Sequence, residues 1–364
     1  MIPPQRPFRL GYRRSLDGVR GAAILLVVLH HGDTIGEGFG FIGVNTFFVL
    51  SGFLITCLLV AEWDASHDIS LRDFYVRRAL RLLPALTIML LAFLVFAFLT
   101  DPRGRAFREL NEALFALFYS TNWAFVFRIG RHMSLSHTWS LSVEEQFYIV
   151  WPVLLFFVLP RTSRTSLLCW IFLAAFLSVI IRIILFVGGT TNLAGNILPM
   201  DLHRLSYGTD TRADSLLLGC FGGVLVSSNL LPRKAWFARA LKASALASGL
   251  VLLAMGACPI WSAWMICAGW FLASVLAMIL IMHLASATHS LPRRFLEFPA
   301  LVYIGQISYG LYIWHAPIRV ALLQYHVPSE NVMYLVFVFP VVLMSYYLIE
   351  RPCLRLKTRF QRAG

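Results

Sequence analysis

Long apolar runs recur along this 364-residue chain and restrict its fold more than any other feature. Hydrophobic residues make up 59% of the sequence and charged residues only 13%, against about 25% charged residues in an ordinary soluble domain. A soluble fold could not bury this much apolar surface, whereas about 20 apolar residues suffice for a helix to cross a bilayer. The sequence therefore predicts an all-α, polytopic membrane helical bundle.

The apolar runs predict ten transmembrane helices within one domain that covers residues 1–364. The predicted spans are residues 18–33, 41–61, 82–99, 143–159, 166–187, 209–228, 243–258, 261–283, 302–325 and 331–349. An even number of spans places both termini on one side, and the basic residues gather in the segments on that side. Since cytoplasmic loops are rich in Lys and Arg, both termini are expected in the cytoplasm. The net charge of +13 has the same explanation, so no nucleic-acid partner is expected.

Residues 100–142 are predicted to be an extracytoplasmic or re-entrant segment, although they hold several arginines. Within this segment, residues 109–127 are apolar enough to be an eleventh span. However, they include Glu109 and Glu112, and another crossing would invert every segment downstream. An interfacial or re-entrant element is therefore the preferred interpretation.

The first predicted span carries ionisable residues that a lipid-facing helix avoids. Arg20 and His31 are eleven positions apart, which is about three helical turns, so they share one face at a separation of about 16 Å. Polar side chains inside a bilayer are costly and usually face a partner or a wet cavity. The pair therefore predicts a polar passage across the membrane, with the neighbouring His30 as a second histidine at its far end.

The second span and the segment after it add further polar candidates. Asn45 lies near the outer end of its span and is expected to face the same cavity as His31. In the same span, Gly43, Ser51 and Gly52 would let neighbouring helices approach closely. The following basic run, Arg77, Arg78 and Arg81, is either an ordinary cytoplasmic anchor or a clamp for phosphate groups.

An acidic pair, Glu144 and Glu145, lies at the start of the fourth predicted span and follows His137 in the sequence. Ser142 and Glu145 have the spacing of a capping box, which predicts a helix start and explains one carboxylate. The pair is predicted to lie at the outer membrane face, level with His31, where a carboxylate could orient an imidazole.

Later spans hold two more polar groups. Asp210, Arg212 and Asp214 begin the sixth span as an internal ion pair or a binding element, and Tyr309, Tyr312 and His315 lie at helical spacing inside the ninth. The six cysteines show no metal-ligand spacing, so no metal is expected.

Seven motifs together resemble the acyltransferase-3 family of integral membrane acyltransferases. They are LDGVRG, FFVLSGFLIT, RRALRLLP, HTWSLSVEEQFY, TRADSLLLG, SYGLYIWHAPI and ERP, in the family's order, and they extend from about residue 15 to residue 352. The resemblance implies a ten-span enzyme of the bacterial inner membrane. Such an enzyme moves an acyl group, usually acetyl, from cytoplasmic acyl-coenzyme A to a hydroxyl of an envelope or exported polysaccharide, lipopolysaccharide or lipid-linked glycan.

The resemblance also implies roles for individual residues. Arg20 and His31 match the family's arginine–histidine pair, and Glu144 matches its external acidic residue; these three are the predicted catalytic residues. Asn45 stands where an acidic residue is common and His30 where tyrosine is common, and the spacing from Arg20 selects His31.

The expected reaction needs no metal. Arg77, Arg78, Arg81 and Arg20 are expected to hold acetyl-coenzyme A, and His31 is expected to act as a general base or transient acyl carrier oriented by Glu144. The expected acceptor-side residues are His137, Asn45, Glu145, Asp210, Arg212, Asp214, Tyr309 and His315.

Two alternatives stay open: acylation of a small molecule such as a macrolide or lipid, and a transporter with an Arg- and His-lined path. Some relatives carry a fused extracytoplasmic domain; none is expected here, because the chain ends at Gly364.

Overall fold

The structure is a computed structural model. It describes residues 10–100, 106–129, 134–188, 199–232, 234–286, 289–326 and 334–356. Several basic residues used to predict the orientation lie outside these ranges: Arg6, Arg9, Arg103, Arg105, Arg131, Arg233 and those beyond Leu356.

The described residues form helices and no strand, as the apolar runs predict. In the first half of the chain the helices are α1 (Arg14–His31), α2 (Glu37–Ser66), α3 (Leu71–Thr100), α4 (Ala106–Leu117), α5 (Thr121–Val126), α6 (Thr138–Val158) and α7 (Arg164–Gly188). The middle of the chain forms α8 (Pro199–Tyr207), α9 (Thr209–Ser227), α10 (Ala235–Gly256), the π-helical segment η1 (Met265–Gly269) and α11 (Trp270–Ser286). The last part forms α12 (Leu291–Leu296), α13 (Pro299–Gln306), α14 (Ser308–Gln324), α15 (Leu335–Ser345), the π-helical segment η2 (Tyr346–Glu350) and α16 (Arg351–Leu356).

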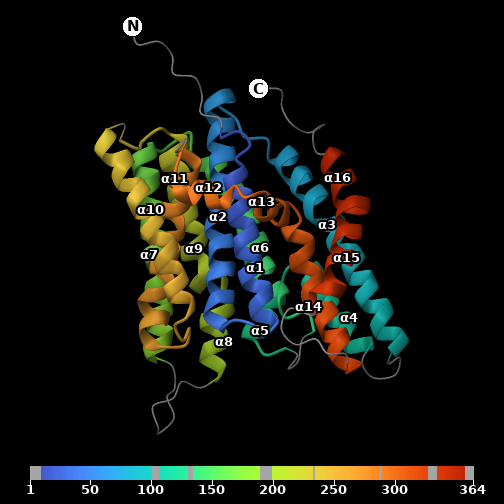
Figure 1. The fold of residues 1–364 in the computed structure, drawn as a ribbon. Helices are drawn as coiled ribbons and strands as arrows, with labels where there is room; N and C mark the ends of the chain where they lie inside the picture. The colour runs from blue at the N-terminus through green and yellow to red at the C-terminus, as the bar shows by residue number, and fades with distance from the viewer. Residues whose placement is uncertain are drawn as a thin grey trace.

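Within the described residues, seven helices are long and apolar enough to cross a membrane, which makes the chain a multi-pass membrane protein. They are α2, α3, α6, α7, α10, η1 continued by α11, and α15 continued by η2 and α16. Three further helices, α1, α9 and α14, run alongside them (Figure 1). Each of α1 and α9 carries three charged side chains near its start, and α14 has only 17 residues, so composition alone does not mark these three as spans.

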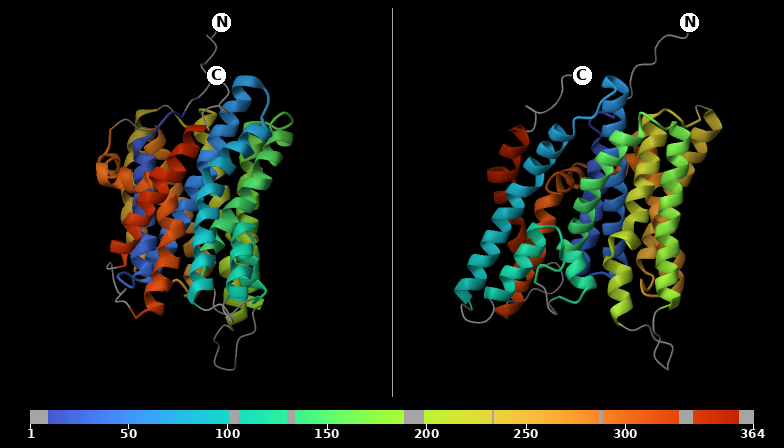
Figure 2. Two further views of the ribbon diagram at one scale, coloured as in Figure 1. Left: turned by 90° about the vertical axis from the view of Figure 1, so that its right-hand side faces the viewer. Right: turned by 180° about the vertical axis from the view of Figure 1, so that it is seen from behind.

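We refer to the two ends of the bundle by the residues at the two ends of α1, as the Arg14 end and the His31 end. The last helix, α16, lies at the Arg14 end (Figure 1), together with α12 and α13. The short helices α4, α5 and α8 lie at the His31 end, as the two further views also show (Figure 2). The stretch 109–127 is thus divided between α4 and α5, and neither is long enough to cross a bilayer.

Glycines bring two pairs of helices into backbone contact. A Cβ atom on Gly52 of α2 would lie 2.0 Å from the carbonyl oxygen of Leu216 in α9, and one on Gly219 would lie 2.1 Å from that of Val49. Likewise, a Cβ on Gly305 of α13 would lie 1.8 Å from the carbonyl oxygen of Asp17 in α1. Close approach through small residues is the usual way for membrane helices to pack, and it confirms the role predicted for Gly52.

Several boundaries differ from the predicted spans. The third helix does not start near Pro84 but at Leu71, with the proline inside it, so the basic run belongs to the same rigid helix. The fourth span starts at Thr138, before the expected capping box. The predicted span 302–325 is two helices, because the backbone turns at Ile307 between α13 and α14.

Candidate functional site

Three histidines meet at the His31 end, between α1, α6 and α14. His31 is the last residue of α1, His137 directly precedes α6, and His315 lies inside α14. The ring centroids of His31 and His315 are 4.9 Å apart, and those of His137 and His315 are 5.2 Å apart. We call these three residues, together with Tyr312, the histidine cluster.

Each imidazole in the histidine cluster uses one ring nitrogen to donate to one or two backbone carbonyl oxygens. His31 Nδ1 lies 2.8 Å from the carbonyl oxygen of Val27, and His315 Nδ1 lies 2.7 Å from that of Tyr312. His137 uses Nε2 in the same way toward Ile313, at 3.3 Å. Because a carbonyl only accepts, the bonded nitrogen of a neutral ring carries the hydrogen, and the other nitrogen keeps a free lone pair.

The ring nitrogens that bind no backbone carbonyl can accept a proton. His137 Nδ1 and His315 Nε2 are buried without a hydrogen-bond partner among the described residues, and no such bond is formed by His31 Nε2 within them either. His31 is the partly exposed member, whereas His137 and His315 are 3% and 0% exposed. His31 Nε2 is therefore the accessible base of the cluster.

The adjacent histidine has a different environment. The ring of His30 packs on α2, where a Cβ on Gly40 would lie 2.4 Å from His30 Cδ2. His31, the histidine selected by its spacing from Arg20, thus contacts His315. His30 instead packs between α1 and α2.

Tyr312 ties the histidine cluster to the start of α6. Its hydroxyl donates to the carbonyl of His137 and also lies at hydrogen-bond distance from the Ser140 hydroxyl. The neighbouring Tyr309 instead donates to the carbonyl of Leu82 in α3, at 2.9 Å. The two tyrosines therefore hold α14 against different helices.

A second polar group lies deeper in the bundle, between α1, α3 and α6. We call Arg20, Arg78, Arg81, Glu144 and Glu145 the arginine–glutamate cluster. Arg78 Nε donates to both carboxylate oxygens of Glu145 at 3.1 and 3.2 Å, and its Nη2 donates to Glu144 at 3.2 Å. The guanidinium also stacks on Tyr148, with its central carbon 3.2 Å from the ring centroid.

Glu144 is not where the sequence places it. It lies six residues into α6, about 9 Å from the start of the helix, and accepts hydrogen bonds from Arg78 and, at 2.6 Å, from Ser51. Ser142, expected to cap the helix, instead donates to the carbonyl of Thr138 inside α6. The prediction that Glu144 lies level with His31 is wrong because the helix begins one turn earlier than the capping pattern indicates.

The arginines of the arginine–glutamate cluster are not equivalent. Arg78 is held by two carboxylates, and Arg20 pairs with Asp17 at 2.8 Å. Arg81 forms no hydrogen bond or ion pair with a described residue, and the charged groups around it include Arg20 and Arg78 together with the carboxylate of Glu144. Arg77, the third arginine of the predicted clamp, lies near the end of α2 with its Nη2 3.7 Å from Glu62. Arg81 is thus the arginine of this run best placed to receive an external anion.

A third polar group lies on the other side of α2, at the His31 end. Asn45 donates to Ser274 at 2.8 Å and accepts from Ser215 at 2.6 Å, so it does not share the surroundings of His31. Asn45 and Ser51 are six positions apart, which turns them to different faces of α2. The expectation that Asn45 faces the cavity of His31 is therefore wrong.

The polar start of α9 does not form an internal ion pair. Asp210 pairs with Arg204, and Asp214 pairs with Arg182 of α7 at 3.0 Å. Among the described residues, Arg212 donates a hydrogen bond only to Asn45, at 3.4 Å, and it lies among aromatic rings. We call Arg182, Arg212, Asp214 and the rings around Arg212 the arginine cage.

One residue of these groups, Arg182, was not singled out from the sequence. Arg182 is an arginine inside an otherwise apolar span, which is by itself a signal of function or of a buried partner. Glu350, the first residue of the ERP motif, is only 5% exposed, and its carboxylate lies 2.7 Å from where a Cβ on Gly310 would be. The continuation of the last helix through η2 and α16 places it inside the bundle.

The turn before His137 is held by two carboxylates of α4. Glu112 accepts a hydrogen bond from the backbone N–H of Leu135 at 3.2 Å, and Glu109 accepts one from Ser134 at 3.4 Å. Burial, and then the nearby charge of Glu109, raise the pKa of Glu112 to about 7. The support of the histidine cluster thus contains a group that titrates near neutral pH.

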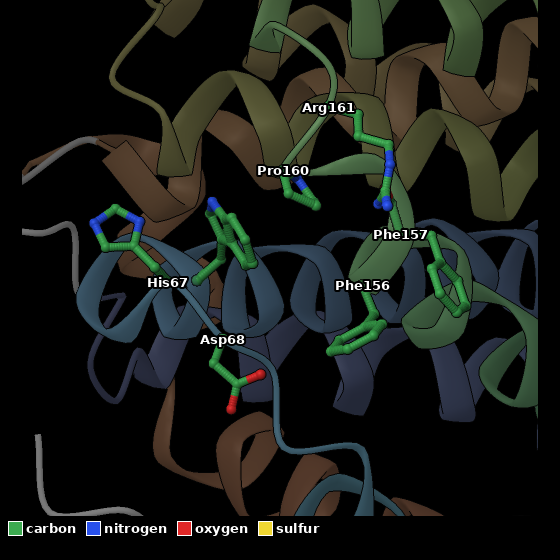
Figure 3. Close-up of a pocket in the computed structure, with 7 residues that line it drawn as sticks. His67, Asp68, Phe156, Phe157, Pro160 and Arg161 are labelled. Atoms are coloured by element: carbon green, nitrogen blue, oxygen red, sulfur yellow. The ribbon is translucent and has the colours of Figure 1, made fainter.

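A surface pocket of about 540 Å³ lies at the Arg14 end, where α2 and α6 terminate. It is lined by Trp63, His67, Asp68, Phe156, Phe157, Pro160 and Arg161. Figure 3 shows the aromatic side chains of α6 and the residues at the end of α2 on its two sides. None of these residues belongs to the three polar groups.

The chain is similar to known proteins over almost its whole length. Residues 13–350 match the protein family described as the acyltransferase domain. The O-acetyltransferase OatA of Staphylococcus aureus (strain NCTC 8325 / PS 47) is 30% identical over 94% of this chain and 57% of its own length.

Two further relatives give similar values. The peptidoglycan O-acetyltransferase OatA of Listeria monocytogenes is 31% identical over 94% of this chain and 56% of its own length, and YrhL of Bacillus subtilis (strain 168) is 33% identical over 94% and 55%. The chain thus spans somewhat more than half the length of these relatives. No solved structure matches it.

Proposed function

Because the chain belongs to the family of the acyltransferase domain, we propose that it is a membrane-bound enzyme that transfers an acyl group, most simply acetyl, to a hydroxyl of a glycan. The names of the relatives from S. aureus and L. monocytogenes support O-acetylation, and the second supports peptidoglycan as the kind of acceptor. The bilayer of the bacterial inner membrane is the proposed location.

The proposed topology has ten crossings, with the Arg14 end in the cytoplasm. It adds α1, α9 and α14 to the seven apolar helices. The basic residues near the Arg14 end support this orientation, since cytoplasmic segments are rich in Lys and Arg. The histidine cluster then faces the extracytoplasmic side, where an envelope glycan is accessible.

The observation that carries the proposal is the succession of polar side chains along α1, α3, α6 and α14. From the Arg14 end it runs through Arg20 and the stretch of α3 that holds Arg78 and Arg81, with Glu144 and Glu145 beside Arg78, and ends at the histidine cluster. A bundle that only had to pack would place apolar side chains here, because buried polar groups in a membrane are costly. The succession suits a donor that enters at one end and an acceptor that enters at the other.

We propose that the donor is acyl-coenzyme A and that Arg81 and Arg20 attract its phosphates. An arginine offers a planar fork of donors to phosphate oxygens, and Arg81 has no competing carboxylate bonded to it. Arg78 is a poor candidate for this role because its donors already serve Glu144 and Glu145. Arg78 and the two glutamates instead fix α3 against α6.

In the proposed reaction, His31 Nε2 removes the proton of the acceptor hydroxyl while the hydroxyl oxygen bonds to the acyl carbon. The carbon–sulfur bond of the thioester breaks, and the departing thiolate takes up the proton from His31. The hydrogen bond from His31 Nδ1 to Val27 keeps the ring in the tautomer that leaves Nε2 free. General base catalysis of this kind contributes about 10²- to 10⁴-fold to a rate.

The test compares two adjacent histidines. Vesicles that contain the wild type, His31→Ala or His30→Ala would receive radiolabelled acetyl-coenzyme A outside and a soluble peptidoglycan fragment inside, or the reverse. Transfer should fall by about 10²-fold or more in His31→Ala and stay within a few-fold of the wild type in His30→Ala, with equal amounts of folded protein. Undiminished transfer by His31→Ala would remove His31 from the reaction.

The same assay tests the class of acceptor. Label in the glycan, with release of coenzyme A, is the expected result. Label found only in added macrolide or in lipid would replace the glycan by a small acceptor, and release of coenzyme A with neither would contradict the proposed transfer.

A further inference from the structure

The arginine cage is buried, and its charged residues belong to neither the histidine cluster nor the arginine–glutamate cluster. Arg182 is 0% exposed, Arg212 1% and Trp270 1%, and they come from α7, α9 and α11. The guanidinium carbon of Arg212 lies 4.6 Å from the ring centroid of Phe41 and 5.0 Å from that of Trp270. The rings of Phe48 and Trp139 lie within 6 Å of the same carbon.

The hydrogen-bond donors of the cage exceed the acceptors around them. Arg182 uses Nε for the carbonyl of Ile266 and Nη1 for Thr211 and Asp214. Its Nη2, the Nε and Nη1 of Arg212, and the indole nitrogen of Trp270 have no partner in the part of the chain that the structure describes. Buried polar atoms in proteins are almost always paired, with protein groups, water or an ion.

The charges of the cage are also unbalanced. Arg182 and Arg212 carry two positive charges, and Asp214 supplies one negative charge. Cation–π contacts offset part of the cost of burying Arg212, but rings stacked on a guanidinium face leave the N–H donors in its plane unpaired. A water molecule could accept one or two of these hydrogens, yet it would leave a net positive charge in a buried site, which is costly.

We propose that the arginine cage is a binding site for one compact monovalent anion, either a halide or a short carboxylate. Such an anion would accept hydrogen bonds from Arg212, Arg182 and Trp270 and would neutralise the cage. It would join α9 to α7 and α11 from within. The inference does not depend on the transfer reaction, because it rests only on the donors and charges of these helices.

Equilibrium binding of radiolabelled chloride to the purified full-length protein tests the proposal. The protein is kept in gluconate at constant ionic strength, since gluconate is a much bulkier anion than chloride. The wild type should bind one chloride per chain in a saturable manner, and its unfolding temperature should rise with chloride and level off. Arg212→Gln should lose both effects, whereas Arg204→Gln, which removes an arginine paired with Asp210 outside the cage, should keep them.

Two further measurements identify the anion and guard against a misfolded variant. Formate that displaces the chloride would identify a site open to carboxylates, and formate without effect would identify a halide site. Trp270→Phe keeps the ring but removes one donor, so it should weaken chloride binding several-fold even if Arg212→Gln does not fold. The proposal is overturned if the wild type shows no saturable binding, if Arg212→Gln binds as the wild type does, or if Trp270→Phe leaves the affinity unchanged.

Discussion

We expect the loss of Arg78 to lower the free energy of unfolding, because Arg78 is the positive charge that two glutamates share. Its side chain is 17% exposed and lies between Glu144 and Glu145, whose side chains are 19% and 8% exposed. In Arg78→Met a side chain of similar length remains, but the two carboxylates lose their shared counter-charge. Removing one partner of a buried ion pair costs about 3–5 kcal/mol, and we expect a loss in this range in the free energy of unfolding.

Arg77→Met is the matched control on the preceding position of α3. Arg77 Nη2 lies 3.7 Å from Glu62, too far for a hydrogen bond, whereas Arg78 donates hydrogen bonds to both of its carboxylates, so the loss of Arg77 should cost less, about 1 kcal/mol. The double variant Arg78→Met/Glu145→Gln should recover part of the stability that Arg78→Met loses, because only one carboxylate, that of Glu144, has then lost the counter-charge of Arg78.

Equilibrium unfolding by SDS in mixed micelles measures all four proteins on one scale. The midpoint should shift far more for Arg78→Met than for Arg77→Met, and the double variant should lie between them. If the two single variants are equally stable, or if Glu145→Gln adds a further loss on top of Arg78→Met, the ion cluster does not stabilise the fold in the way described.

Two other predictions use the same unfolding assay. Gly52→Ala should lower the free energy of unfolding by about 1–3 kcal/mol or more, because the added methyl group meets the carbonyl oxygen of Leu216. Gly249→Ala, which has open space around it, should change the free energy of unfolding by no more than about 1 kcal/mol. Equal effects of the two substitutions would contradict the close packing of α2 and α9. Because the pKa of Glu112 is raised in the folded protein, the folded state keeps a proton on this carboxyl group at a pH where the unfolded chain has released it. The free energy of unfolding should therefore fall as the pH rises from about 4.5 to about 7, by up to about 1.4 kcal/mol per pH unit. Glu112→Gln should flatten this slope while retaining an acceptor, and an unchanged slope would exclude Glu112 as its source.

The helices were largely predictable from the sequence because apolar length is a local property. The span predicted at 209–228 coincides with α9 within one residue, and the glycine at position 52 packs as its surroundings indicated. The errors at helix ends have local causes as well. The spacing of Ser142 and Glu145 fits a capping box, but the chain before them is already helical from Thr138.

The partners of the polar residues could not be predicted in the same way. Periodicity shows that Asn45 and Ser51 leave α2 on different faces, but it does not show which helix each face meets. The carboxylate of Glu144 could equally have met a histidine or an arginine, since the choice depends on the relative depth of α3 and α6. That depth is set by the whole bundle, whereas the sequence reveals only where each helix begins and ends.

The position of α2 between two polar groups has a consequence for how this chain can vary. One face of the helix presents Asn45 to Ser215 and Ser274, and another presents Ser51 to Glu144, while Gly52 rests against α9. A rigid helix cannot turn to improve one of these contacts without disturbing the others. Positions 45 and 51 are therefore constrained together, although they never touch, and a substitution at either should be tolerated among homologues only with a compensating change in α6, α9 or α11.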